Sequence, residues 1–202
     1  MAQSQDSIQL PGPALTGQYS LEQALSQRRS VREYLNSKLR LSELGQLLWA
    51  AQGITSIQGF RTAPSAGALY PLELYVVAVN VEGLDPGLYH FHPGKFRLTL
   101  LQATEFSKIL SHAALGQRWV EDAAAVVVFA AVYERTTKKY GQRGQRYVHI
   151  ETGHAAQNLF LQAQTLRLGT VVVGAFDDEE VAQVLHLPPE VKPLLLMPIG
   201  RI

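Results

Sequence analysis

Apolar side chains recur with a helical period in several stretches of the chain. Positions 44, 47, 48 and 51 follow the i, i+3, i+4, i+7 spacing, which predicts a helix that opens at Ser42 and stops at Gly53, where we expect a positive φ. Ser20 and Gln23 have the spacing of a capping box, which predicts a short helix starting at Ser20. Three further helices are expected: one capped by Thr104, a long one that follows a polar loop over residues 134–147 and stops at Gly169, and one capped by Asp177 with Glu180.

Other apolar stretches have the β-branched and aromatic content of strands. LELYVVAV (72–79) predicts a buried strand, and AAAVVVFAAVY (123–133) is apolar enough to lie in the middle of a sheet covered on both faces. Residues 88–92 and 95–101 flank Pro93-Gly94 and predict a β-hairpin, while 170–173 and 194–197 predict two more strands. The interleaving of helices and strands favours a helix-flanked sheet of α+β or α/β class.

Composition narrows the function classes. The first 19 residues are rich in Pro and Gly, so we expect an extended arm followed by one domain over residues 20–202. Eighteen Lys and Arg balance seventeen Asp and Glu, a net charge of +1, which gives no general attraction to nucleic acid or an anionic membrane. No signal peptide and no apolar run of about 18 residues is present, so we expect a cytoplasmic protein.

Several chemistries are excluded or disfavoured by the residues that are missing. The chain has no Cys, which excludes disulfides, thiolate catalysis and Cys-ligated metals. His149 and His154 are five apart instead of four, so no metal site is expected. The sequence also has no GxxxxGK[ST] loop, and no GxGxxG follows a strand.

The basic stretch that follows the first helix is a candidate phosphate site. If the chain is extended there, Arg28, Ser30 and Arg32 point to one side and bring two guanidiniums and a hydroxyl to one anion, with Arg29 beside them. The alternative is a solvated helix end whose positive charge complements the helix dipole.

Two small-residue turns and the C-terminus are further candidates. In the TAPSAGALYP stretch (62–71), small residues at 64–67 let backbone amides approach a flat or charged ligand, although a surface turn is the alternative. Gly174-Ala175 lies between a predicted strand and a predicted helix. The exposed amides there either donate to a ligand or belong to an ordinary strand-to-helix turn. Arg201 is either a phosphate ligand or part of a frayed tail.

Taken together, these segments resemble the nitroreductase-like flavoprotein family. The similar stretches, in order from about Ser20 to Arg201, are SLEQALSQRRSVREY, LSELGQLLWAAQGI, RTAPSAGALYPLELYVV, GLYHFHPGKFRLTLL, KYGQRGQRYVHIETGHAAQNLFLQA and GTVVVGAFDDEEVAQVLHLP…MPIGR. More narrowly, the chain is similar to the SagB-type dehydrogenase branch, which includes azoline oxidases. The resemblance implies an FMN-binding α+β fold, a central mixed sheet flanked by helices, and a homodimer with two flavins at the subunit interface.

The resemblance also implies roles for individual residues. Arg28 and Ser30, with Arg29 beside them, would bind the FMN phosphate and ribityl chain. Arg32 would lie at the flavin N1 and O2 edge, and Arg201 would make a second contact with the phosphate. The partner subunit would bring Pro64, Ser65, Ala66 and Gly67 to the flavin, and the amides of Gly174 and Ala175 would face its N5 and O4 atoms. Lys139 and Tyr140 match a pair implicated in proton removal by azoline oxidases, with ordinary surface charges as the alternative.

The expected function is therefore an FMN-dependent oxidoreductase that takes hydride from NAD(P)H or dehydrogenates a small-molecule or peptide substrate directly. One alternative is an azoline dehydrogenase that makes thiazoles or oxazoles in peptides. Another is a protein that binds FMN or senses redox state without efficient turnover. A fixed cation at Arg32 favours turnover, because negative charge develops on the N1 and C2 carbonyl region during reduction.

Overall fold

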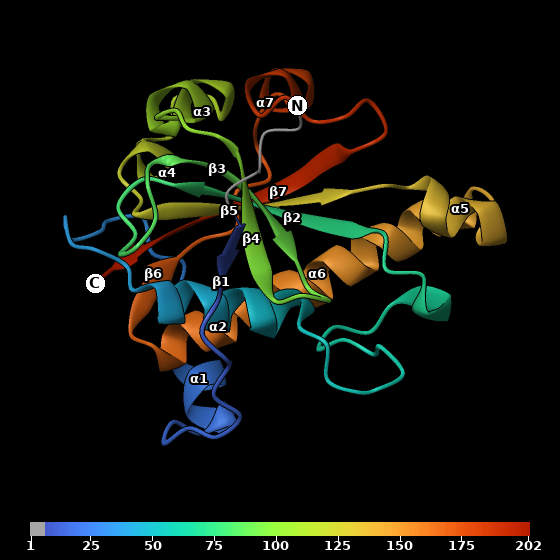
Figure 1. Ribbon diagram of the computed structural model, residues 1–202, viewed down its shortest axis with the longest axis horizontal. Helices are drawn as coiled ribbons and strands as arrows, with labels where there is room; N and C mark the ends of the chain where they lie inside the picture. Colours follow the sequence, from blue (N-terminus) through green and yellow to red (C-terminus); the bar gives the residue numbers. More distant parts are fainter. Residues whose placement is uncertain (1–6) are drawn as a thin grey trace.

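The computed structural model describes residues 7–202, in which helices and strands alternate as an α+β fold (Figure 1). The elements in chain order are β1 (Ser7–Gln9), α1 (Leu21–Gln27), α2 (Leu41–Gln52), the short 3₁₀ helix η1 (Ala66–Ala68), β2 (Leu72–Ala78), β3 (Gly87–His92), β4 (Arg97–Gln102), α3 (Ser107–Ala113), α4 (Arg118–Glu121), β5 (Ala125–Ala131), α5 (Glu134–Tyr140), α6 (Arg143–Thr165), β6 (Leu168–Thr170), α7 (Asp178–Val184) and β7 (Lys192–Arg201). Within residues 7–202, no helix combines the length and the apolar content needed to cross a bilayer.

The strands form one seven-stranded sheet in the order β1-β4-β3-β2-β5-β7-β6. Every ladder between named strands is antiparallel, so the expectation of a mixed sheet is wrong. The reason is the connectivity: β2, β3 and β4 follow one another as neighbouring hairpin strands, and the helical crossover after β5 returns the chain as β6 and β7 without a parallel neighbour.

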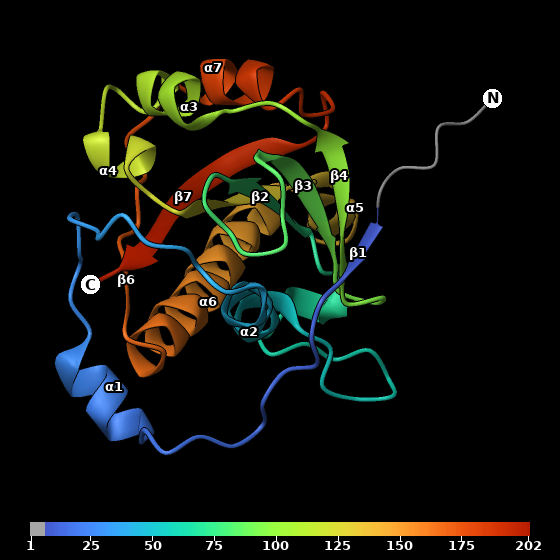
Figure 2. The same cartoon turned by 60° about the vertical axis from the view of Figure 1, so that its left-hand side comes forward.

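The apolar strand β5 lies in the interior of the sheet, next to the central strand β2, as its sequence predicts. β5 pairs with β2 on one side and β7 on the other, and all seven of its residues are buried. The helices α2 and α6 cover one face and α3, α4 and α7 cover the other (Figures 1 and 2). Two separate hydrophobic clusters lie on the two faces, which is the arrangement that a strand apolar on both sides requires.

Close backbone packing holds the segment after α1 against the sheet edge. The Val31 amide donates to the Thr170 carbonyl at 2.9 Å. A Cβ on Gly169 would lie 2.7 Å from a Val31 methyl, and one on Gly200 would lie 2.5 Å from the Tyr34 ring. Glycine is therefore required at both positions for residues 31–34 to lie across β6 and β7.

Several helix ends differ from the sequence expectations. The capping box of Ser20 and Gln23 is present, but α2 begins one residue before Ser42, where Arg40 and Glu43 form the capping interactions. The helix expected at Thr104 begins instead after Phe106, because the Glu105 carboxylate accepts from the Ser107 amide. A positive φ at Gly53 is also wrong: its φ is −63°, and the Trp49 side chain occupies the place of a Cβ.

The polar stretch expected as a loop over residues 134–147 contains a helix. Residues Glu134–Tyr140 form α5, and α6 begins at Arg143 after a turn at Gly141, whose φ is +57°. A Cβ on Gly144 would lie 2.9 Å from the Thr137 Cα, so α5 and α6 are in close contact. This tertiary contact, which the polar sequence does not reveal, explains why the segment is helical.

The described residues near both ends of the chain form strands, where an arm was expected at the start and a frayed tail was one alternative at the end. Within the arm expected over residues 1–19, Ser7–Gln9 form the edge strand β1 and Leu10 is buried, while the first six residues lie outside the described part. The last strand runs to Arg201 and is longer than the expected 194–197. β6 covers 168–170 instead of 170–173, although Val173 still makes a bridge to Leu196.

Candidate functional site

The basic residues that follow α1 lie outside any helix or strand, and Arg28 and Arg32 each contact an aromatic ring of a different helix. The Arg28 guanidinium lies 4.7 Å from the centre of the Phe160 ring on α6, and that of Arg32 lies 5.5 Å from the Trp119 ring on α4. Arg29 turns back and donates to the carbonyls of Ser26 and Arg28, so it caps the end of α1. Aromatic rings thus fix Arg28 and Arg32 by stacking, which leaves their N–H edges available.

Gly174 and Ala175 lie close to this basic stretch through α4. The Gln117 side-chain amide donates to the Ala175 carbonyl at 2.6 Å. Two residues further on, the Trp119 ring contacts the Arg32 guanidinium. Gly174 and Ala175 are exposed, and nothing lies within 4 Å of the Cβ position of Gly174. Contacts through residues 117–119 thus link Arg32 to the 174–175 turn. Together with Arg28 and Ser30, which precede Arg32 in the chain, we call Arg32, Trp119, Gly174 and Ala175 the arginine half-site.

The residues of the arginine half-site fit a bound phosphate-bearing flavin. In residues 7–202, Arg28, Arg29 and Arg32 form no ion pair with a carboxylate. The indole N–H of Trp119 and the Thr170 hydroxyl are buried and make no hydrogen bond to the described protein atoms. The unpaired cations and the unsatisfied buried polar atoms near the exposed Gly174-Ala175 turn indicate a site for an anionic ligand that also forms hydrogen bonds.

Pro64–Gly67 and Lys139-Tyr140 form a second set, which the sequence left as two separate candidates. Gly67 lies in η1 with φ +66°, and a Cβ there would lie 2.8 Å from the Tyr140 hydroxyl and 3.0 Å from the Lys139 Nζ. Lys139 Nζ is also 5.4 Å from the centre of the Tyr140 ring. We call Pro64, Ser65, Ala66, Gly67, Lys139 and Tyr140 the loop half-site.

A buried carboxyl that the sequence analysis did not single out, that of Glu151, lies beside the loop half-site. Glu151 on α6 is 2% exposed, and burial raises its pKa to about 7, although a hydrogen bond from Ser65 and the charge of Arg61 both oppose the rise. The Ser65 hydroxyl also accepts from the Tyr70 amide at 2.9 Å. The helical period of the sequence could have revealed its burial, because Glu151 lies on the same face of α6 as the buried Val148 and Ala155.

The two half-sites lie far apart in one chain. Arg28 contacts α6 at Phe160. The loop that carries Pro64–Gly67 follows Thr62, whose carbonyl accepts from the Asn158 side chain on α6, and its Ser65 lies near Glu151, nine residues before Phe160. At the rise of an α-helix this separation is about 14 Å along the axis. Figure 1 shows α1 below one end of α6 and α5 beside the other.

Arg201 does not lie free for a ligand. Its guanidinium donates to both carboxylate oxygens of Glu43, at 2.8 and 3.1 Å, and to the Lys38 carbonyl. Glu43 is 3% exposed. Burial raises the pKa of its carboxyl, but the hydrogen bonds from Arg40 and Arg201 together lower the pKa by more, so it lies below its usual range. Arg201 thus joins the end of β7 to the start of α2.

The comparison with known proteins agrees with this fold. Residues 25–201 match the Nitroreductase family, and the chain belongs to that family. It is 48% identical over 194 residues to MJ1384 of Methanocaldococcus jannaschii, which carries a provisional nitroreductase name, and the match covers 96% of each chain.

The chain is also similar to a solved structure and, more distantly, to a peptide-processing protein. A crystal structure from Anabaena variabilis, also given a provisional nitroreductase name, superposes with a TM-score of 0.86 at 31% identity over 98% of this chain, which spans 42% of that one. The similarity to the SagB-type branch is distant: the microcin B17-processing protein McbC of Escherichia coli is 28% identical over 70% of this chain and 54% of its own length.

The raised pKa of Glu151 predicts how stability changes with pH. Below about pH 4.5, its usual pKa, the carboxyl is protonated in both the folded and the unfolded chain; above it the unfolded chain ionises first, so stability falls as the pH rises through about 7. We expect Glu151→Gln to reduce this fall, measured as the urea-unfolding free energy across the window. Glu179→Gln, which removes an exposed carboxyl on α7, is the control, and an unchanged pH slope in Glu151→Gln contradicts the assignment.

Proposed function

We propose that this protein is an FMN-dependent oxidoreductase that works as a homodimer, with each flavin bound between the arginine half-site of one chain and the loop half-site of the other. The observation that carries the proposal is the separation of the two half-sites along α6, because each contains residues that the family resemblance assigns to the same cofactor. Membership of the Nitroreductase family supports the class of reaction.

The arginine half-site would hold the cofactor by its charged end. Arg28, stacked on Phe160, keeps its N–H donors for the phosphate, and the Ser30 hydroxyl adds a hydrogen bond. Arg29 contributes mainly its positive charge, since one of its terminal nitrogens already donates to carbonyls at the end of α1. Arg32 would lie at the N1 and O2 edge, held by Trp119.

When bound, FMN supplies two-electron chemistry by accepting or donating hydride at N5. The positive charge of Arg32 would stabilise the negative charge that develops on reduction, and the Gly174 and Ala175 amides would donate to the O4 and N5 edge. Gln117 fixes this turn through the Ala175 carbonyl, so the donors are oriented before the ligand arrives. NAD(P)H is the proposed electron donor, and a second small molecule would occupy the same face in turn.

An azoline dehydrogenase is the second candidate, and the position of Lys139 and Tyr140 beside Gly67 favours it. In a dimer these side chains would face the same flavin as Pro64–Gly67 do. Such a reaction needs a base that removes a carbon-bound proton, and a Lys amine near an apolar cofactor surface is suited to that role. The distant similarity to McbC agrees with this candidate.

The first test is the presence of the cofactor and its contact with Arg28. We expect the purified protein to be yellow, to release FMN on denaturation, and to bind it about 1.5–3 kcal/mol more weakly as Arg28→Ala, because a charge-assisted phosphate contact is lost. Arg146→Ala, on the exposed side of α6, is the matched control for overall charge. A colourless protein that takes up no added FMN, or an unchanged dissociation constant in Arg28→Ala, would contradict the proposal.

The second test separates the two enzyme candidates. Arg32→Ala should lower the flavin midpoint potential and slow reduction by any donor, because the cation beside the developing charge is lost. Lys139→Ala should slow only azoline oxidation, by about 10²–10⁴ if Lys139 is the base. Lys138→Ala, which removes the neighbouring exposed amine paired with Glu134, is the control. A protein bleached by NAD(P)H and inert toward a model azoline peptide rules out the second candidate, and undiminished azoline oxidation in Lys139→Ala rules out the base.

A further inference from the structure

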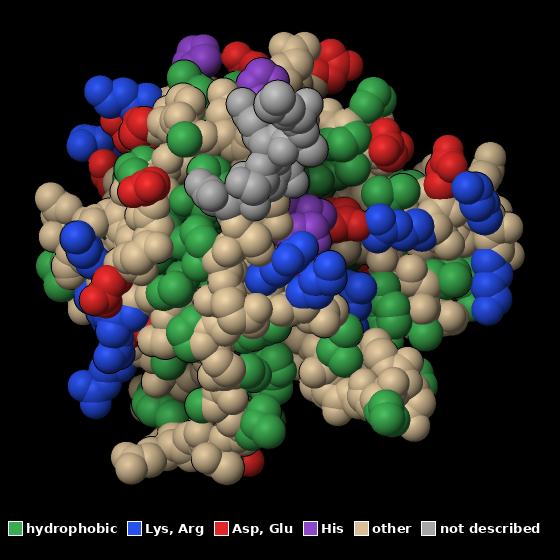
Figure 3. Space-filling view, viewed as in Figure 1, with side chains coloured by type: hydrophobic (Ala, Val, Ile, Leu, Met, Phe, Trp, Pro, Cys, Tyr) green, Lys and Arg blue, Asp and Glu red, His purple; other side chains and the backbone are tan. Residues whose placement is uncertain are grey.

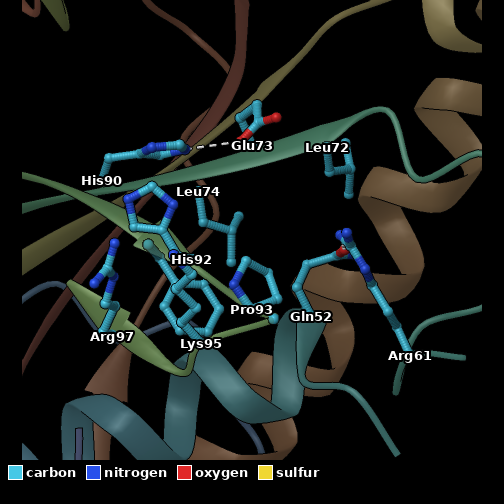
Figure 4. Close-up of a pocket in the computed structure, with 12 residues that line it drawn as sticks. Gln52, Arg61, Leu72, Glu73, Leu74, His90, His92, Pro93, Lys95 and Arg97 are labelled. Atoms are coloured by element: carbon cyan, nitrogen blue, oxygen red, sulfur yellow. Dashed lines mark hydrogen bonds and ion pairs between the residues drawn. The ribbon is translucent and has the colours of Figure 1, made fainter. Parts of the chain in front are cut away.

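A cavity of about 450 Å³ lies outside both half-sites, between the end of α2, the start of β2 and the β3–β4 hairpin (Figure 4). This volume is in the range of small-molecule sites. None of the described residues that line it belongs to the arginine or the loop half-site. Basic side chains and histidine gather on this face of the molecule in the space-filling view (Figure 3).

Three buried N–H donors in the cavity wall have no partner. Gln52 is fully buried, and its carbonyl oxygen accepts from the Arg61 guanidinium. Because a guanidinium can only donate, this contact fixes the orientation of the amide and leaves the Gln52 NH₂ as the free group. The Nε atoms of Arg61 and Arg97 are also buried without a partner among the described residues. Unsatisfied buried donors cost stability, so three of them around one cavity indicate a missing acceptor.

The charge of the cavity has the sign that such an acceptor requires. Glu73 is the one carboxylate among the described lining residues, and it is already paired with His90 at 2.7 Å and with Arg135. In residues 7–202, Arg61, Lys95 and Arg97 form no ion pair with a carboxylate, although the charges of Glu73 and Glu151 act on Arg61. The pKa of His92 is lowered, first by burial and then by its cationic neighbours, which agrees with a positive local field.

The donors occupy two opposite walls. Figure 4 shows Gln52 and Arg61 together on one side of the cavity and Arg97 with Lys95 and His92 on the other, with Pro93 and Leu74 between them. The Arg61 guanidinium is also held 4.4 Å from the centre of the Tyr70 ring, so its wall is rigid. Two separated groups of donors with apolar side chains between them match a ligand with two anionic ends and a short apolar middle.

We propose that this cavity binds a small organic dianion of the dicarboxylate type, with one carboxylate at Gln52 and Arg61 and the other at Arg97. The inference is independent of the proposed flavin chemistry, because it uses none of the flavin-binding residues. Arg61 nevertheless links the two regions, since it also lies near Glu151. A bound dianion would satisfy the three free donors at once.

The probes are succinate, inorganic phosphate and acetate, each titrated by calorimetry into the protein as purified, at low ionic strength. We expect succinate to bind at least about tenfold more tightly than acetate, because succinate carries two carboxylates and acetate only one. Binding of phosphate without succinate would overturn the two-ended ligand. Absence of heat with all three probes at millimolar concentration would overturn the site altogether.

Variants assign the binding to the cavity. Arg97→Gln should weaken succinate binding about tenfold or more, and Gln52→Met should do the same if the variant folds. Lys108→Gln, which removes the same charge from α3 on the opposite side of the sheet, is the control and should change the dissociation constant less than twofold. Equal weakening in Arg97→Gln and Lys108→Gln contradicts the proposal. FMN content measured in the same samples distinguishes this failure from failure of the flavin proposal.

Discussion

The length of α6 fixes how far apart the two sets of candidate flavin-binding residues lie within one chain. The helix has 23 residues, about 34 Å at the standard rise, and both half-sites contact it. The arginine half-site lies against Phe160 in its last third and the loop half-site against Glu151 in its first half. In our proposal, one flavin uses the arginine half-site of one chain and the loop half-site of its partner.

The position of α6 depends in turn on the sheet. β5 is apolar on both sides, and the long cluster of buried side chains on one face packs α2 and α6 against it. The basic segment after α1 is fixed separately, by the close approach of Val31 and Tyr34 to Gly169 and Gly200. These contacts fix the path of the segment, and the rings of Phe160 and Trp119 hold the guanidiniums of Arg28 and Arg32 without any ligand. Such prior placement lowers the entropic cost of binding an anion.

The sequence predicted the parts of this structure that have a local cause. The capping box of Ser20 and Gln23, the buried strand β5 and the helix capped by Asp177 were all predicted, because each depends on residues near in sequence. The helix α5 was missed since its residues are polar and its stability comes from contact with α6. The all-antiparallel sheet was missed for a similar reason, because strand direction depends on the route of the whole chain.

The same division applies to the candidate site. The basic stretch and both small-residue turns were found from composition and from the family resemblance. The contact of the Pro64–Gly67 turn with Lys139 and Tyr140 was not, because Gly67 and Tyr140 lie 73 positions apart in the sequence. Arg201 illustrates this limit: the sequence could not show that its guanidinium pairs with the buried Glu43, 158 residues away. Only the folded chain reveals such a pairing.

Subunit complementation tests the central claim, that one flavin is shared between two chains, most directly. Arg28→Ala alters the arginine half-site, and Gly67→Val alters the loop half-site, because a branched side chain is strained at φ +66° and would meet Tyr140. Each variant alone should bind FMN weakly. A mixed dimer, isolated with two different affinity tags, contains one site with both halves intact and should bind one FMN with wild-type affinity. A mixed dimer that binds FMN no better than either parent would show that each site lies within a single chain.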